Sequence, residues 1–593
     1  MLDTLITGGT LVDGTGAPAR PADIGIAGNR IVAVADPGEL ADAAAEASDA
    51  TDATKATETI DADGLVVCPG FIDPHTHYDA QIFWDPRATP SNLFGVTSVI
   101  GGNCGFSLAP LTHPDDGEYL KRMMVKVEGM ELAALEQGVP WDWESFADYL
   151  RAVETRGIGV NAGFLVGHCA LRRAVMRDDA VGHEANDDQI ALMRALLAES
   201  LAAGGLGFST GRSYTHNDWD GRPVPSRWAS EEEVLELCRE TATHPGTTLE
   251  WVADGCMKGF SDDEVDLMTR MSLEARRPLN WNVLTIDSAR PDDYRNQIAA
   301  CERAAEAGAI VIALTMPILV GMNMNLGTFC ALHMLPGWPD TFGLPTAERM
   351  EALRRPETLI ALENSAASPE AGVFSRLTGW SYYRIGDTYS AANEGLKGRR
   401  VGDIARERGQ RDFFCLVDIC LNDDLRTVLW PAPTDDDPES WRLRAEAWEH
   451  PAVMIGGSDA GAHLDRMAGA CYTTAWIDDC LRGRRLTTLE NAVRHLTEAP
   501  ARLFGLKGRG RIAEGYHADV VLFDPDTVGA QEPVLVADLP GDGRRLWSEA
   551  TGVRRVLVNG VTTVVDGEAT EALPGTVLRS GRHTATVPVG AAG

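Results

Sequence analysis

Long apolar runs are missing from this sequence of 593 residues. No stretch approaches the roughly 18 consecutive apolar residues of a membrane-spanning helix, so we expect no membrane span and no membrane partner. The N-terminus, from Met1 to Gly9, has neither the basic segment nor the long apolar segment of a secretory signal. These features predict a cytoplasmic protein.

Cysteine is sparse, with eleven residues in the whole chain and no pair spaced as CxxC. Disulfide frameworks occur in short, cysteine-rich secreted chains, and cysteine-based zinc sites use closely spaced pairs. We therefore expect reduced thiols and no disulfide framework.

Positive charge is also in deficit, because 53 basic residues stand against 87 acidic ones and give a formal net charge of −34. Such a chain repels phosphate backbones and anionic lipid surfaces, so nucleic acid is not an expected partner. We interpret the net negative charge as a feature that keeps the protein soluble. The sequence leaves the oligomeric state open, a homo-oligomer included.

Short alternating runs mark both ends of the chain as β structure. Thr4-Leu-Ile-Thr and Arg30-Ile-Val-Ala-Val lie near the start, and Ala518-Asp-Val-Val-Leu-Phe lies near the end. The pair Asn559-Gly560 is a signal for a β-hairpin. We predict that segments 1–65 and 508–593 together form one small β-sandwich.

Between these ends, residues 66–507 alternate strand-length apolar runs with long helical patterns, which is typical of parallel βα units. Three helix starts fit a capping box, at Ser230/Glu233, Ser261/Glu264 and Thr487/Glu490. Eight repeats predict an α/β fold of the TIM-like (β/α)8 barrel type, with insertions. The expected strands are Val66–Ile72, Val96–Ile100, Val160–Val166, Leu206–Ser209, Thr247–Val252, Leu279–Leu284, Ile310–Leu314 and Val453–Ile455.

The first and last of these strands end in residues suited to metal chemistry, at the carboxyl ends where barrel active sites lie. The first ends in Pro69-Gly-Phe-Ile-Asp-Pro-His75-Thr-His77, and spacing of two along an extended chain places both imidazoles on one face. The eighth ends in Gly456-Gly-Ser-Asp459, next to the first strand in a barrel. Two histidines and an aspartate suit zinc, and the aspartate can also exchange protons. An isolated HxH motif is equally compatible with two polar histidines in a loop.

The second strand ends in Gly101-Gly-Asn-Cys104. A single cysteine is most often a buried structural residue. Its place at the end of a strand makes Cys104 a further candidate ligand.

With these residues in place, the chain resembles the amidohydrolase superfamily, and within it the D-aminoacylase (N-acyl-D-amino-acid deacylase) group. Further matching segments are Gly-Asn103-Cys104-Gly, Leu165-Val-Gly-His168, Gly207-Phe-Ser-Thr-Gly-Arg-Ser-Tyr214, Gly457-Ser-Asp459, Ala499-Pro-Ala-Arg-Leu-Phe-Gly-Leu and Gly510-Arg-Ile-Ala-Glu-Gly-x-x-Ala-Asp519. The resemblance spans nearly the whole chain. It implies a metal site of His75, His77, Cys104 and Asp459, with Asp459 as the catalytic acid and base.

Two ligands of that group have no counterpart here. Where the group has its fifth-strand histidine the sequence has Glu250, and near the sixth-strand histidine it has Asn280 and Asn282. A basic residue that would bind a substrate carboxylate is also absent after the sixth strand. Glu250 can supply an oxygen ligand and Asn282 a hydrogen bond, which favours a single, altered metal site with one divalent ion of the zinc type.

Four other polar residues follow predicted strands and are candidate metal or substrate contacts: His168, Arg212, Tyr214 and His463. His168 can equally hold neighbouring loops together by hydrogen bonds. His463 can orient Asp459. Arg212 and Tyr214 can bind a carboxylate or a carbonyl.

The sequence therefore predicts a metal-dependent hydrolase of C–N bonds other than peptide bonds, with a small amide as substrate. The resemblance favours N-acyl-D-amino acids. One alternative is hydrolysis of a cyclic amide, an imide or a related compound. Another is a catalytically inactive protein that keeps the fold and serves in binding.

Overall fold

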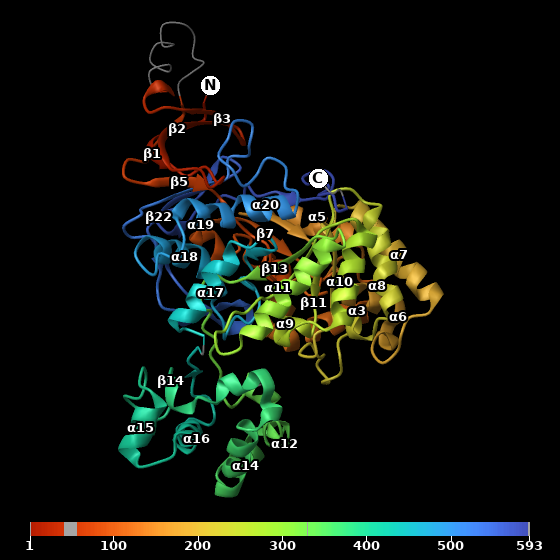
Figure 1. The fold of residues 1–593 in the computed structure, drawn as a ribbon, viewed down its shortest axis with the longest axis vertical. Coiled ribbons are helices and arrows are strands. Elements are labelled where there is room, and N and C mark those ends of the chain that lie inside the picture. Colours follow the sequence, from red (N-terminus) through yellow and green to blue (C-terminus); the bar gives the residue numbers. More distant parts are fainter. Residues whose placement is uncertain (1, 41–55, 329, 434, 591–593) are drawn as a thin grey trace. The chain divides into compact units, whose positions relative to one another are not determined.

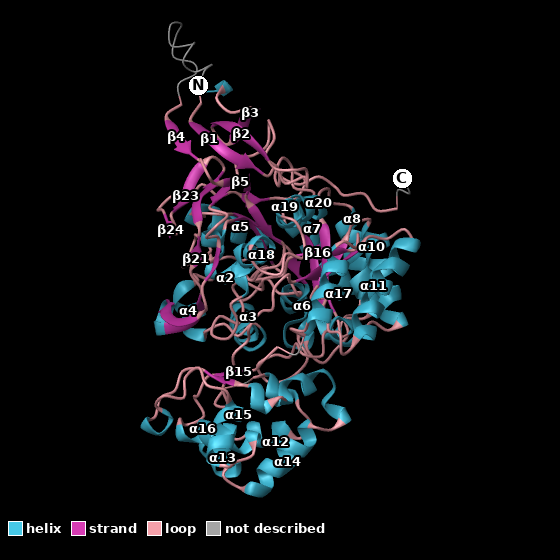
Figure 2. Cartoon of the chain, turned by 60° about the vertical axis from the view of Figure 1, so that its left-hand side comes forward, coloured by secondary structure: helices cyan, strands magenta, loops and turns pink. Residues whose placement is uncertain are grey.

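Strands from both ends of the chain meet in one mixed sheet of nine strands. The computed structural model describes residues 2–40, 56–328, 330–433 and 435–590. The sheet order is β24-β23-β22-β17-β5-β1-β2-β3, and β4 pairs with β1. The strands are β1 (Thr4–Leu11), β2 (Arg20–Ala27), β3 (Arg30–Ala35), β4 (Glu58–Asp61), β5 (Val66–Pro69), β17 (Val520–Phe523), β22 (Val553–Val558), β23 (Val561–Val565) and β24 (Glu568–Ala569). Figure 2 shows the strands of this region in magenta. A β-rich terminal region built from both ends is confirmed.

The hairpin between β22 and β23 forms as the sequence predicts. Its two turn residues, Asn559 and Gly560, have φ angles of 49° and 82°. Positive φ at both central positions matches the right-handed twist of the flanking strands, and Asn-Gly adopts it at low cost. Ile24, Val520 and Leu522 contribute to the apolar core beside this sheet.

Parallel strands in the middle of the chain form two further sheets, in the orders β6-β7-β8-β25 and β9-β10-β11-β12-β13-β16. Only Leu165 separates β8 from β9, and a parallel bridge joins Thr76, after β6, to Ala460, after β16. Strands form at all eight predicted positions, but their ladder is divided into two sheets. The third predicted run, Val160–Val166, is itself divided into β8 and β9, which belong to different sheets. The strands are β6 (Phe71–Asp73), β7 (Val96–Gly101), β8 (Asn161–Phe164), β9 (Val166–Gly167), β10 (Gly207–Gly211), β11 (Thr248–Val252), β12 (Leu279–Trp281), β13 (Val311–Thr315) and β16 (Val453–Ile455), with β25 (Val577–Leu578) from the C-terminal segment.

The first predicted strand, Val66–Ile72, is two strands that belong to different sheets. Val66–Pro69 pairs with β1 and β17, whereas Phe71–Asp73 pairs with β7. The chain changes sheet at Gly70, whose N–H donates to the carbonyl of Asp519. A Cβ atom at Gly70 would lie 2.2 Å from the hydroxyl of Thr97, so only glycine fits this crossing.

Helices connect the parallel strands and pack beside one another along their outer side (Figure 1). The Ser261 capping box is formed. Ser230 also caps its helix, but the side chain of Glu233 turns inward, and at the third site the cap is Thr488 with Asn491. The main helices are α3 (Pro114–Val127), α5 (Phe146–Arg156), α6 (His168–Met176), α7 (Asp187–Ala202), α8 (Glu231–Ala242), α10 (Asp262–Ala275), α11 (Pro291–Glu306), α17 (Pro438–Trp448), α18 (Tyr472–Leu481), α19 (Leu489–Leu496) and α20 (Glu498–Leu503).

Residues Leu319–Pro438, between β13 and β16, form a second compact unit. This unit has a separate hydrophobic core, in which the rings of Trp338, Trp380 and Phe413 pack against one another. This unit lies inside the segment 66–507 that the sequence assigns to the barrel and its insertions. Its elements are α12 (Trp338–Phe342), α13 (Thr346–Leu353), α14 (Pro356–Ala366), β14 (Arg384–Ile385), α15 (Val401–Arg408), α16 (Asp412–Asn422) and β15 (Leu429–Trp430).

No disulfide joins any of the described cysteines. Within the described ranges, no helix is both long enough and apolar enough to cross a bilayer.

Candidate metal centre

Two histidines extend from the end of β6 into the interior. Thr76, between them, bonds through its N–H and its hydroxyl to the carbonyl of Ile100 on β7. Because side chains alternate along an extended segment, His75 and His77 then point together to the other side. Both are buried, and their ring centroids are 5.4 Å apart.

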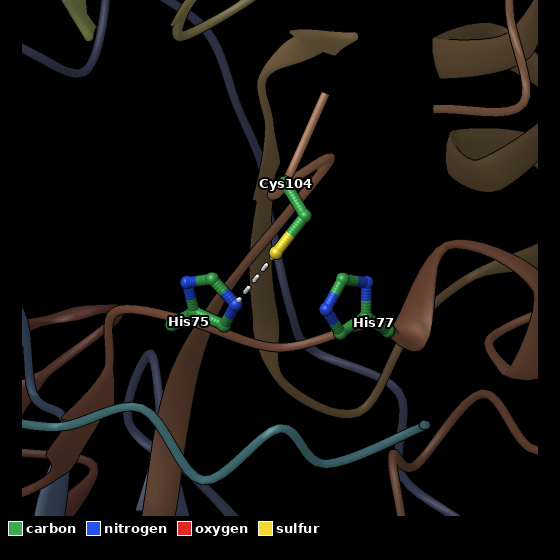
Figure 3. Close-up of side chains that lie close together, drawn as sticks. All are labelled: His75, His77 and Cys104. Atoms are coloured by element: carbon green, nitrogen blue, oxygen red, sulfur yellow. Dashed lines mark hydrogen bonds between the residues drawn. The ribbon is translucent and has the colours of Figure 1, made fainter. Parts of the chain in front are cut away.

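Cys104 follows β7 and faces His75, as Figure 3 shows. Its Sγ atom is 3.5 Å from Nε2 of His75. The side chain of Asn103 fixes this turn by donating to the carbonyls of Thr76 and Ile100. Burial, followed by the nearby carboxylate of Glu250, raises the pKa of the Cys104 thiol well above its usual value. A cation beside the sulfur would counter this effect and favour the thiolate.

Asp459 lies after β16, beside the same histidines. Its Oδ1 atom is 3.5 Å from Nε2 of His75 and 3.2 Å from Nε2 of His77. Burial acts to raise the pKa of Asp459, but its interactions with the two histidines hold that pKa well below the usual value. The side chain keeps 27% of its surface exposed, so it is the member of the cluster that small molecules can reach.

Glu250 and Asn282 also reach this cluster. Glu250, on β11, accepts the backbone N–H of Cys104 at 2.7 Å, and burial raises its pKa to about 8. Asn282 follows β12, and its Nδ2 atom is 3.3 Å from Nε2 of His75. Glu250 and Asn282 therefore lie beside Cys104 and His75.

The structure adds an acidic residue that the sequence analysis missed. Glu128 follows α3, is buried, and places Oε2 at 3.6 Å from Nε2 of His77. It comes at the end of a helix rather than after a barrel strand, so inspection of strand ends passes over it. The Glu-Gly pair marks the end of the helix in the sequence, but it does not place Glu128 beside His77.

Of the four other candidate residues, His463 lies beside the cluster, whereas the contacts of Arg212, Tyr214 and His168 are with residues outside it. His463 is near Asp459, with Nε2 at 3.8 Å from Oδ2. Arg212 donates to the carbonyl of Ala229.

Tyr214 and His168 make contacts outside the cluster. The backbone N–H of Tyr214 donates to Asp254, and the ring lies below Lys258. His168 bonds to Thr210 and to Glu233, each at 2.8 Å, so both ring nitrogens already have partners.

The cluster fits a divalent metal ion by the chemistry of its donors. His75, His77 and Cys104 offer one ligand atom each within 4.8 Å of one another, and so do His77, Glu128 and Asp459. Ligands of one tetrahedral zinc ion are separated by about 3.3–3.6 Å, given bond lengths of about 2.0–2.3 Å. Three of the separations between neighbouring donors, at 3.5–3.6 Å, lie in this range, and the fourth, 3.2 Å between His77 and Asp459, lies just below it.

Unpaired donors support the same conclusion. Oε1 of Glu250 is buried and makes no hydrogen bond to any of the described residues, and Nε2 of His77 lies beside the carboxylates of Asp459 and Glu128 without a hydrogen bond of good geometry to either. Buried polar atoms without partners are uncommon because they cost free energy. A bound cation would satisfy them.

A parallel α/β core with two histidines after its first strand and an aspartate after its last is the arrangement of a metal-dependent hydrolase. The comparisons agree: residues 58–567 match the model of the amidohydrolase family. The chain belongs to this family and is an amidohydrolase enzyme.

Two curated relatives come from Alcaligenes xylosoxydans xylosoxydans. D-aminoacylase is 30% identical over 94% of this chain and 93% of its own length, and N-acyl-D-aspartate deacylase is 29% identical over 98% and 95%.

A solved structure of D-aminoacylase has a TM-score of 0.62 at 28% identity and covers 98% of this chain and 100% of its own. N-acyl-D-glutamate deacylase of Bordetella bronchiseptica, complexed with zinc and a phosphonate inhibitor, has a TM-score of 0.61 at 25% identity, with the same coverage. The fold is therefore of the TIM-barrel-like α/β type.

Proposed function

We propose that this amidohydrolase removes the acyl group from N-acyl-D-amino acids at a metal centre made by His75, His77, Cys104 and Asp459. The observation that carries the proposal is the convergence of these four side chains from the ends of three strands, with neighbouring donors at 3.2–3.5 Å. The similarity to D-aminoacylase and to two N-acyl-D-amino-acid deacylases over nearly the full chain supports the substrate class.

A divalent ion held there supplies Lewis acidity for an amide carbonyl and for the attacking water. Zinc is the ion we propose, because a histidine and cysteine donor set suits it and the Bordetella relative is complexed with zinc. We propose one ion per chain, since Glu250 and Asn282 stand where the family has two further histidines.

Asp459 is the proposed acid and base. Its Oδ1 atom faces the two histidines, while its exposed portion can reach a substrate. A carboxylate with a lowered pKa is ionised at neutral pH, so it can accept a proton from the attacking water. The protonated carboxyl group of Asp459 then gives the proton to the leaving nitrogen, which departs as an amine.

The substrate class is tested by hydrolysis of a panel of N-acetyl-D-amino acids, their L-enantiomers, and cyclic amides and imides. Cleavage of the D-compounds supports the proposal. Cleavage of the cyclic compounds alone would replace it with the cyclic-amide alternative, which keeps the metal centre and changes the substrate.

Metal content per chain is measured in parallel by elemental analysis, on the wild type and on a His75→Ala/His77→Ala double variant. We expect about one ion per chain in the wild type and its loss from the variant, because the histidines supply two of the four donors. A wild-type protein that hydrolyses amides without any bound metal would overturn the metal-dependent mechanism.

A further inference from the structure

Glu128 is a buried carboxylate at the C-terminal end of a helix, a position that is unfavourable for negative charge unless a cation is nearby. It is the C-cap residue of α3 (Pro114–Val127), where the backbone carbonyls make the helix end negative. Its side chain is 4% exposed. Burial of a carboxylate at a negative helix end costs free energy unless a cation compensates for it.

The neighbours of Glu128 increase that cost. The carboxylates of Asp459 and Asp79 also act on Glu128, and their like charge adds to the cost of its burial. Its ion-pair partner among the described residues is His77, which Asp459 shares. Glu128 therefore shares its imidazole partner with a second carboxylate, an arrangement that a divalent cation would stabilise.

The backbone holds Glu128 in this place. Its carbonyl accepts the N–H of His463 at 2.5 Å, which ties the end of α3 to the loop that carries Asp459. Gly129 follows with φ of +60°, and a Cβ atom there would lie 3.1 Å from Nδ1 of His463. This close approach positions the Glu128 side chain against the cluster from a direction that no barrel strand supplies.

We infer that Glu128 is a ligand of the metal ion, together with His77 and Asp459. The inference rests on the proposed function, because it requires a metal at this centre. Glu128 supplies an oxygen donor to a site where Glu250 and Asn282 replace two histidines of the family. The separation of 3.6 Å between Oε2 of Glu128 and Nε2 of His77 lies at the upper end of the range for two ligands of one ion.

The test is the affinity for zinc, measured by competition with a chromogenic chelator on the full-length wild type and on Glu128→Gln. Removal of the charged donor should weaken zinc binding by at least about tenfold. Glu136→Gln is the matched control, because Glu136 is exposed on the neighbouring helix and loses the same charge. Its zinc affinity should equal that of the wild type.

A second readout separates ligation from a general effect on folding. In cobalt-substituted protein, a thiolate-to-cobalt absorption band reports Cys104, while the d–d bands report the number and geometry of the ligands. We expect the Glu128→Gln variant to keep the thiolate band and change its d–d bands. Circular dichroism of the chelator-treated proteins should be the same for all variants.

The outcomes are distinct. Unchanged zinc affinity and unchanged cobalt spectra in Glu128→Gln, with metal bound by the wild type, would overturn the role of Glu128 and leave the proposed function intact. Absence of zinc binding in the wild type would overturn both. Weakened binding in Glu136→Gln to the same extent would show a long-range charge effect and would also overturn the ligand assignment.

Discussion

The buried cluster around Glu233 offers the sharpest test of stability in this fold. Glu233, on α8, bonds through both carboxylate oxygens to Nη1 of Arg172 on α6 and accepts from His168 at 2.8 Å. All three side chains are fully buried. The substitution Glu233→Gln keeps the size of the side chain and removes its charge, so the guanidinium of Arg172 would remain in the interior without its counter-ion.

The magnitude follows from what Arg172 retains. Its Nη2 atom donates to the carbonyls of His183 and Ala180, and neither of these partners is charged. Loss of one partner of a buried ion pair costs about 3–5 kcal/mol. Because the glutamine can still accept a hydrogen bond, we expect about 3 kcal/mol, at the lower end of that range.

The assay is urea-induced unfolding of the wild type and of Glu233→Gln, with Glu232→Gln as the matched control. Glu232 is the preceding residue on α8 and makes an exposed ion pair with Arg239, which is worth about 0–1 kcal/mol. A double variant, Glu233→Leu/Arg172→Met, should recover most of the lost stability because it removes both charges. A loss in Glu233→Gln no larger than that in Glu232→Gln would refute the reasoning.

The same variant decides how His168 acts. If His168 holds α6 and α8 together, the metal content of Glu233→Gln should equal that of the wild type while its stability falls. Loss of metal in the folded variant would show instead that this histidine belongs to the metal centre.

Two further predictions concern catalysis and pH. Asp459→Asn should lower kcat by about 10²–10⁴-fold, because an amide cannot take the proton, while bound metal is retained through the remaining donors; unchanged amide hydrolysis would remove Asp459 as the base. Burial, and then the charge of Arg494, lower the pKa of His495 to about 4, so the unfolded chain binds a proton near pH 6.5 before the folded one does. Stability present above pH 6.5 should therefore fall towards pH 4 by about 1.4 kcal/mol per pH unit, and urea unfolding of His495→Gln should show a flatter acid limb than the wild type.

The repetition of strands and helices was readable from the sequence because it depends on local patterns. Apolar runs of strand length predicted all eight parallel strands, and Asn559-Gly560 predicted its hairpin. The runs at Val66–Ile72 and Val160–Val166 were each predicted as one strand but contain two strands of different sheets, since a continuous apolar stretch does not show where the chain passes from one sheet to another. The first of these crossings depends on the contact of Gly70 with Thr97 on β7.

The histidine pair, Cys104 and Asp459 were also identifiable from the sequence, because each follows a strand and the carboxyl ends of parallel strands meet. The structure brings these four side chains together. Glu128 and the partners of His168 were decided only by the tertiary structure. A helix end has no fixed place relative to the strand ends until the helices pack, so no periodicity or spacing could show that Glu128 faces His77 or that Glu233 faces His168.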